Sequence, residues 1–177
     1  MSLDAIRVAI QIALVSLASY LGGSHSSGLI HGASASIGGL WCAISGIVVL
    51  QATRRETWSS AWLRIVGTAI GSILSAVYLT LLPFSPLGMA VSVFATVLIC
   101  HGARIPDHAR LAAITVTVIM VIASLNPTLN PIQNALLRFS ESCIGTVAAV
   151  LAILIWPGPS EPSDMAPSAA LDETARS

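Results

Sequence analysis

The chain has 177 residues, of which 55% are hydrophobic and only 9% are charged, and its formal net charge is zero. Soluble domains carry roughly a quarter charged residues, so there is too little charge here to cover a soluble surface. The chain has no lysine and no basic stripe interleaved with aromatic residues, which argues against nucleic-acid binding. The composition predicts an integral membrane protein whose outer face contacts the lipid bilayer.

Six apolar runs are long enough to cross the hydrocarbon core as helices. They do not alternate between polar and apolar residues as the strands of a β-barrel do. The expected fold is an all-α membrane domain over residues 1–157, with the first run retained rather than cleaved as a signal peptide. The six expected transmembrane helices cover residues 5–21, 37–53, 61–82, 87–102, 109–125 and 132–156.

Polar segments are expected to connect these runs. Residues 22–36 form a stretch of Gly, Ser and His that predicts a loop, and residues 54–60 hold a charge cluster that predicts another. Residues 158–177 are rich in Pro, Ser, Ala and acidic side chains, a composition that cannot bury enough apolar surface to fold. We expect them to form a disordered cytoplasmic tail.

The arginines of the six-helix region are concentrated on one side of this topology. In loops and helix ends, positive charge marks the cytoplasmic side of a membrane protein, so both termini are expected in the cytoplasm. Arg138 alone falls on the opposite side. The arginines that share the cytoplasmic side are Arg7, Arg54, Arg55, Arg64, Arg104 and Arg110.

An internal repeat relates the two halves of the chain. Residues 63–71 align without gaps on residues 137–145, both segments begin with Leu-Arg, and both run on to a proline. Chance similarity between two apolar helices is the alternative. A true repeat gives two units of three helices, and the odd number forces the units into opposite orientations, as in many transporters.

Ionisable residues within a span usually line a cavity or form a pair, because inserting them is costly. Arg138 and Glu141 lie three residues apart on one helix face. They are candidates for binding an anionic substrate; the alternative is an interfacial pair that reaches the headgroups. Arg64, the repeat equivalent of Arg138, is a third candidate, or else an ordinary cytoplasmic flank. A guanidinium at each mouth of a pathway would suit a carboxylate, which it binds in a bidentate fork.

Two further features of the sequence bear on helix packing and on possible chemistry: the glycines, and the residues that could bind a metal. Gly67 and Gly71 have the spacing that lets membrane helices approach closely, so a packing role is expected. The three cysteines lie in apolar runs, and the histidines fall as two pairs on opposite sides. We expect no metal, no cofactor and no enzymatic activity, since no catalytic or phosphate-binding motif is present.

Residues 40–51, with Trp41 near the start and Gln51 at the end, resemble a segment of the fusaric acid resistance (FUSC) and aromatic acid exporter family. The Arg-Ile-Val-Gly-Thr segment that begins at Arg64 resembles the next motif of that family, and residues 137–145 resemble its sixth helix. The resemblance covers about residues 5–157. The positions that match are Trp41, Gln51, Arg64, Gly67, Thr68, Gly71 and Gly145.

This resemblance implies a multi-pass protein of the bacterial inner membrane that exports organic acid anions, aromatic ones in particular. The chain differs from the larger family members in having one six-helix block and no sizeable soluble domain, which makes a homo-oligomer or a partner membrane subunit more plausible. The alternatives are a membrane accessory or structural subunit that transports nothing itself, and an anion channel.

Overall fold

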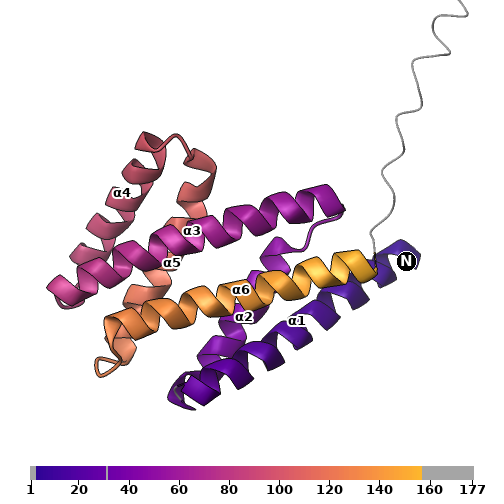
Figure 1. The fold of residues 1–177 in the computed structure, drawn as a ribbon, viewed down its shortest axis with the longest axis horizontal. Helices are drawn as coiled ribbons and strands as arrows, with labels where there is room; N and C mark the ends of the chain where they lie inside the picture. The colour runs from indigo at the N-terminus through magenta and orange to yellow at the C-terminus, as the bar shows by residue number, and fades with distance from the viewer. Residues whose placement is uncertain (1–2, 31, 157–177) are drawn as a thin grey trace, which may run out of the picture.

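The computed structural model describes residues 3–30 and 32–156, and all regular structure among them is helical (Figure 1). The expected all-α membrane architecture is confirmed. In chain order the elements are α1 (Leu3–Ile30), η1 (Gly32–Ser34), α2 (Ala35–Val49), α3 (Arg54–Leu81), α4 (Pro86–Gly102), α5 (Pro106–Leu125) and α6 (Pro131–Ile155). The predicted tail at 158–177 lies outside the described residues.

The helices differ in length. Among the described residues, α1, α3, α5 and α6 are long and apolar enough to cross a membrane. α2 has 15 residues and α4 has 17. At about 1.5 Å per residue, these two helices reach roughly 22 and 26 Å, which is less than the hydrocarbon core of about 30 Å. Six spans were expected; residues 3–30 and 32–156 form six α-helices, of which four have the full length of a span.

The first helix is longer than the sequence predicts, because α1 continues through the Gly/Ser/His stretch to Ile30. The expected loop at 22–36 is therefore wrong. The hydroxyls of Ser24 and Ser26 donate to backbone carbonyls three residues earlier in the same helix, so they need no water. Gly23 lies directly against Cys42 and the backbone of Gly38 on α2. The small residues that suggest a loop instead allow α1 and α2 to pack closely.

The charge cluster at 54–60 also belongs to a helix. Thr53 and Glu56 form a capping box, in which Glu56 N donates to Thr53 Oγ1 at 3.2 Å and Thr53 N donates to Glu56 Oε2 at 3.3 Å. This reciprocal pair satisfies two backbone donors at the helix start, so α3 begins at Arg54 rather than near residue 61. α2 ends earlier than expected, at Val49.

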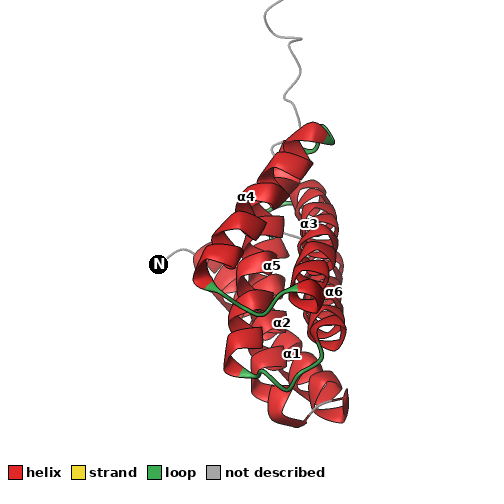
Figure 2. Ribbon diagram, turned by 90° about the vertical axis from the view of Figure 1, so that its left-hand side faces the viewer, coloured by secondary structure: helices red, strands yellow, loops and turns green. Residues whose placement is uncertain are grey.

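α3 and α6 lie side by side and run antiparallel through the middle of the molecule (Figure 1). α2 packs against α6, and α5 packs against α3. α1 contacts α2 and α6, while α4 contacts α5 and α3. Exchanging the first three helices for the last three reproduces this set of neighbours, which is the arrangement expected of an inverted repeat. Seen from the side, the α3–α6 pair forms one layer, with α2 and α5 beside it (Figure 2).

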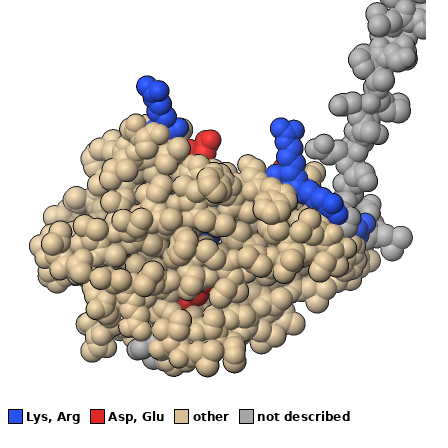
Figure 3. Space-filling model, in the orientation of Figure 1, with Lys and Arg blue, Asp and Glu red and all other residues tan. Residues whose placement is uncertain are grey.

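The surface is apolar and the interior is partly polar. Leucines and isoleucines such as Leu29, Leu81 and Ile155 are more than three-quarters exposed, while many serines and threonines are buried. A soluble protein shows the opposite tendency, whereas lipid accepts an apolar exterior. Most of the visible basic side chains lie along one edge, and only small blue and red areas show in the middle of that face (Figure 3). The exposed arginines at the start of α3, the start of α5 and the end of α4 are Arg54, Arg55, Arg104 and Arg110.

Candidate functional site

Buried polar side chains from four helices meet where α3 crosses α6. We call this group the arginine cluster. Each of its members is at most 5% exposed, in a protein whose outer surface is largely apolar. Its members are Ser27 from α1, Trp41 and Ser45 from α2, Arg64 and Thr68 from α3, and Arg138, Glu141 and Ser142 from α6.

Arg64 joins three helices. Its Nε donates to Ser142 Oγ at 3.0 Å and to Ser45 Oγ at 3.2 Å, and its Nη2 donates to Ser45 Oγ at 2.8 Å. Its Cζ lies 4.7 Å from the centroid of the Trp41 ring, within the range of a cation–π interaction. Arg64 thus has hydroxyl and aromatic partners but no carboxylate partner among the described residues, and it links α3 to both α2 and α6.

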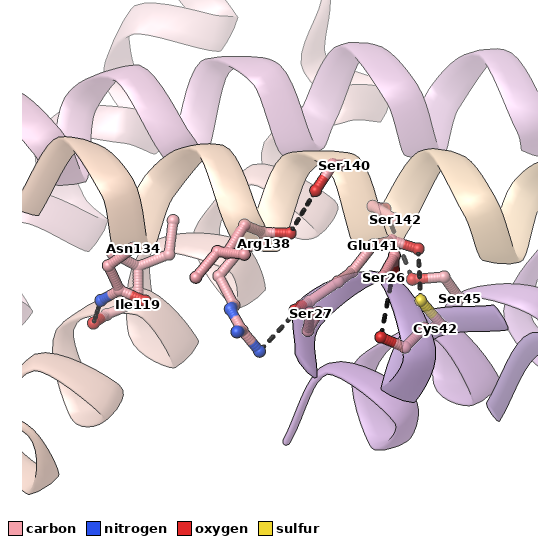
Figure 4. Close-up of polar contacts among 12 residues, drawn as sticks. Ser26, Ser27, Cys42, Ser45, Ile119, Asn134, Arg138, Ser140, Glu141 and Ser142 are labelled. Carbon is pink, nitrogen blue, oxygen red and sulfur yellow. Dashed lines mark hydrogen bonds and ion pairs between the residues drawn. The ribbon is translucent and has the colours of Figure 1, made fainter. Parts of the chain in front are cut away.

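The side chain of Arg138 has different partners from that of Arg64. It is fully buried, and its Nη1 lies 2.8 Å from Glu141 Oε2 (Figure 4). Beyond this ion pair, none of its three guanidinium nitrogens has a hydrogen-bond acceptor within the part of the chain that the structure describes. The alternative in which Arg138 reaches out to the headgroups is therefore wrong. Buried guanidinium nitrogens without acceptors are costly, so the guanidinium of Arg138 has donors that a further hydrogen-bond acceptor could use.

Glu141 is held from the other side by α1. Its Oε1 accepts a hydrogen bond of 2.5 Å from Ser27 Oγ. Gly38 of α2 leaves the room for this contact, since a Cβ at that position would collide with Ser27 and lie 2.6 Å from Glu141 Oε1. Cys42 Sγ donates to the backbone carbonyl of Glu141 at 3.0 Å. The carboxylate therefore sits in a tight space formed by α1, α2 and α6.

A pocket of about 360 Å³ opens between α2 and α5, beside the cluster. Isoleucine, leucine and valine side chains make most of its wall, and Trp41, Thr117 and Arg138 complete it. The exposed part of this wall is apolar, and Arg138, which lines the pocket, is itself fully buried. The pocket can accept the apolar body of a ligand, and the side chain of Arg138 adjoins it.

A family model described as fusaric acid resistance protein-like matches residues 15–152. The chain belongs to this family. The matched range begins in α1, ends in α6 and includes every member of the arginine cluster. The resemblance inferred from the sequence is thereby confirmed. Nothing among the curated proteins or the solved structures matches the chain.

In this fusaric acid resistance protein-like chain, the motif glycines lie at helix contacts. A Cβ on Gly67 would be 2.8 Å from Leu111 Cβ, and one on Gly71 would be 2.5 Å from Ala112 O, so both glycines pack against α5. Gly145, the repeat equivalent of Gly71, lies against the backbone of α2. Gly67 and Gly71, for which a packing role was expected, thus lie at a contact between α3 and α5. Gln51 is exposed beyond the end of α2 and is no part of the cluster.

The two arginines do not stand at separate mouths of a pathway. Arg64 reaches Ser142, which lies one helical turn after Arg138, so both guanidinium groups belong to one buried cluster. Thr68 and Ser142 are equivalent residues in the repeat, and their hydroxyl oxygens are 3.1 Å apart. The symmetry axis of the repeat therefore passes close to this pair. Among the described residues, no group of three or more His, Cys, Asp or Glu side chains could hold a metal ion.

Some residues of the site were not foreseen. Ser27 falls in the stretch that the sequence alone assigns to a loop, and Ser45 and Ser142 look like ordinary small residues of membrane helices. For Ser142 a signal exists, because the repeat places it over Thr68 of the family motif. Ser45 has no comparable signal, since its role depends on where α2 and α3 cross.

Proposed function

We propose that this protein transports organic anions, with export of aromatic carboxylates as the main activity. The observation that carries this proposal is the buried guanidinium of Arg138, which has one ion pair, no other acceptor among the described residues, and an apolar pocket beside it. A carboxylate supplies the missing acceptors, because its two oxygens match two N–H groups of a guanidinium.

The pocket favours a carboxylate with an apolar body. Its volume of about 360 Å³ lies within the range of about 300–1,000 Å³ common for small-molecule sites. Its aliphatic wall and the edge contributed by Trp41 would remove a ring from water. A small inorganic anion would leave most of this wall without contacts, so the lining supports an organic anion over an inorganic one.

The proposed location is the bacterial inner membrane, with both termini in the cytoplasm. The exposed arginines at the ends of α3, α4 and α5 support this orientation, because positive charge marks the cytoplasmic side. A homo-oligomer, or a complex with a second membrane subunit, would shield the short helices α2 and α4. A non-transporting accessory subunit and an anion channel are the competing functions.

Transport assays in proteoliposomes test this function. The purified protein is reconstituted, and uptake of radiolabelled benzoate and phenylacetate is measured. Arg138→Lys is the informative variant, because lysine keeps the ion pair with Glu141 but loses the planar fork. Arg138→Ala would instead leave Glu141 unpaired and cost roughly 3–5 kcal/mol of stability.

The matched control is Arg110→Lys, which changes an exposed arginine at the start of α5 in the same way. We expect uptake by the wild type and by Arg110→Lys, and a large loss in Arg138→Lys. Absence of uptake in all three proteins would favour the accessory subunit. Rapid uptake that does not saturate with concentration would favour the channel.

A further inference from the structure

We propose that Glu141 carries a proton that is bound together with the substrate anion. This inference rests on the proposed function, since it requires a carboxylate at Arg138. In the absence of substrate, Glu141 is ionised and paired with Arg138. When the substrate carboxylate binds Arg138, Glu141 takes up one proton and becomes neutral.

The charges in the cluster lead to this conclusion. Arg64 is already bonded to Ser45 and Ser142 and stacked on Trp41, so it does not serve as a partner for Glu141. Arg138 is the cation that faces the carboxylate. A substrate on Arg138 would place two carboxylates on one guanidinium in a site without solvent access. Two carboxylates that share a site do not both remain ionised, and one of them takes a proton.

The surroundings of Glu141 accommodate both of its forms. Ser27 donates to Oε1 when Glu141 is ionised. A hydroxyl is also an acceptor, so a protonated Glu141 can donate to Ser27 Oγ and keep this partner. The bond from Cys42 Sγ goes to the backbone carbonyl of Glu141, so it persists in either state. Ser27 therefore remains a hydrogen-bond partner of Glu141 in either form.

The titratable and charged groups of the described residues around Glu141 come from three helices. α6 contributes Arg138, α2 contributes the thiol of Cys42, and α3 contributes Arg64, whose contacts are with hydroxyls. α1 contributes the hydroxyl of Ser27. Glu141 is the one carboxylate among the described protein groups here, so it is the protein group that receives the proton.

The binding step balances in charge and in protons. One anion and one proton enter, the Arg138–Glu141 ion pair opens, an Arg138–substrate ion pair forms, and the proton resides on a carboxyl oxygen of Glu141. Release reverses each change. The net charge of the site is the same before and after binding. Because one proton binds with each anion, affinity should fall up to about tenfold for each unit rise in pH.

Isothermal titration calorimetry on the purified protein measures this coupling. Benzoate and phenylacetate are titrated at pH 7.5 in buffers of different ionisation enthalpy, which gives the number of protons taken up per anion. The variants are Glu141→Gln, which keeps the shape and a partner for Ser27, and Asp107→Asn. Asp107 is an exposed acid in the first turn of α5 and serves as the matched control.

We expect the wild type and Asp107→Asn to take up close to one proton per anion and to bind more weakly as pH rises. Glu141→Gln should bind without proton uptake and with an affinity that does not change with pH. Binding by the wild type without proton uptake would overturn the inference, and so would equal uptake in Glu141→Gln. If neither anion binds the wild type, the proposed function itself fails.

Discussion

Replacement of Gly145 by alanine should destabilise the protein, because α6 contacts α2 without any space at this position. An added Cβ would overlap the carbonyl oxygen of Cys42 and lie 2.9 Å from both Gly46 N and Ser45 Cβ. Two of these three atoms belong to the backbone of α2, so a rotamer change cannot relieve the overlap and the helices must separate. Overpacking of this kind costs typically 1–3 kcal/mol, and an overlap with backbone belongs near the upper end.

A smaller effect opposes this cost. Alanine in a helix interior is more favourable than glycine by roughly 0.5–1 kcal/mol. The net destabilisation of Gly145→Ala is then about 2 kcal/mol. At roughly 2–4 °C per kcal/mol for a chain of this size, the melting temperature should fall by about 4–8 °C. Separation of α2 from α6 would also move Ser45 away from Ser142 and weaken their shared contact with Arg64.

The measurement is thermal stability in detergent, followed by size-exclusion chromatography after heating. Gly102→Ala is the matched control, because a Cβ at that position would meet nothing within 4 Å and no described glycine has a positive φ. Gly102→Ala should melt at or slightly above the wild-type temperature. If Gly145→Ala also melts at or above that temperature, α2 and α6 do not approach each other as described, and the reasoning fails.

Three further predictions follow from the packing, the helix caps and the topology. Gly71→Leu should lower expression and melting temperature, because even a Cβ would lie 2.5 Å from Ala112 O; wild-type behaviour would mean that α3 and α5 do not meet there. Asn130→Ala removes the side-chain cap of α6, whose Oδ1 accepts from Ile132 N at 2.9 Å, and should cost about 1 kcal/mol of stability. The melting temperature should fall by a few degrees, and an unchanged value would mean that the cap contributes nothing. A reporter active only in the periplasm, fused after Ser177, should give no signal, and a strong signal would contradict the proposed orientation.

The helices could be predicted from the sequence, but several of their ends could not. Long apolar runs identify membrane helices because lipid requires them, so each of the six expected runs overlaps a helix of the described residues, four of which have the length of a span. Small polar residues are ambiguous, however. Ser24 and Ser26 would suit a loop, yet their hydroxyls bond within α1 and so permit the helix to continue. The charged residues after Thr53 indicate a loop by composition, while the capping box that the structure reveals starts a helix.

The charged residues of the site could be predicted from the sequence, and its serines could not. Arg138 and Glu141 stand out in any apolar segment, because an ionisable group in a span needs a specific reason. Ser27 and Ser45 do not stand out, since a serine costs little in a membrane helix and many occur there. Their contacts depend on the crossing of α1 and α2 with α6, which no spacing along the chain shows. The repeat predicted equivalent places for Arg64 and Arg138, but not that one bonds to hydroxyls and the other to a carboxylate.

Because the two arginines have different partners, substitution by lysine should lower the melting temperature when made at Arg64 and the benzoate affinity when made at Arg138. In Arg64→Lys, a single ammonium cannot donate to Ser45 and Ser142 in the same geometry and stack on Trp41 as the planar guanidinium does. Hydrogen bonds from charged groups contribute roughly 1.5–3 kcal/mol each, so the melting temperature should fall clearly. Arg138→Lys keeps the ion pair with Glu141, and its melting temperature should stay near that of the wild type.

Benzoate affinity should be lowered more by Arg138→Lys than by Arg64→Lys. Arg138→Lys loses the fork that receives the carboxylate, so benzoate affinity should fall about tenfold or more, which corresponds to the loss of one charge-assisted hydrogen bond at roughly 1.4 kcal/mol per factor of ten. Arg64→Lys should retain most of its benzoate affinity at temperatures well below its melting point. Melting temperature and benzoate affinity are measured on both variants in the same detergent. If Arg138→Lys loses as much stability as Arg64→Lys, or binds benzoate as the wild type does, then Arg138 is a structural residue like Arg64 and does not bind the anion.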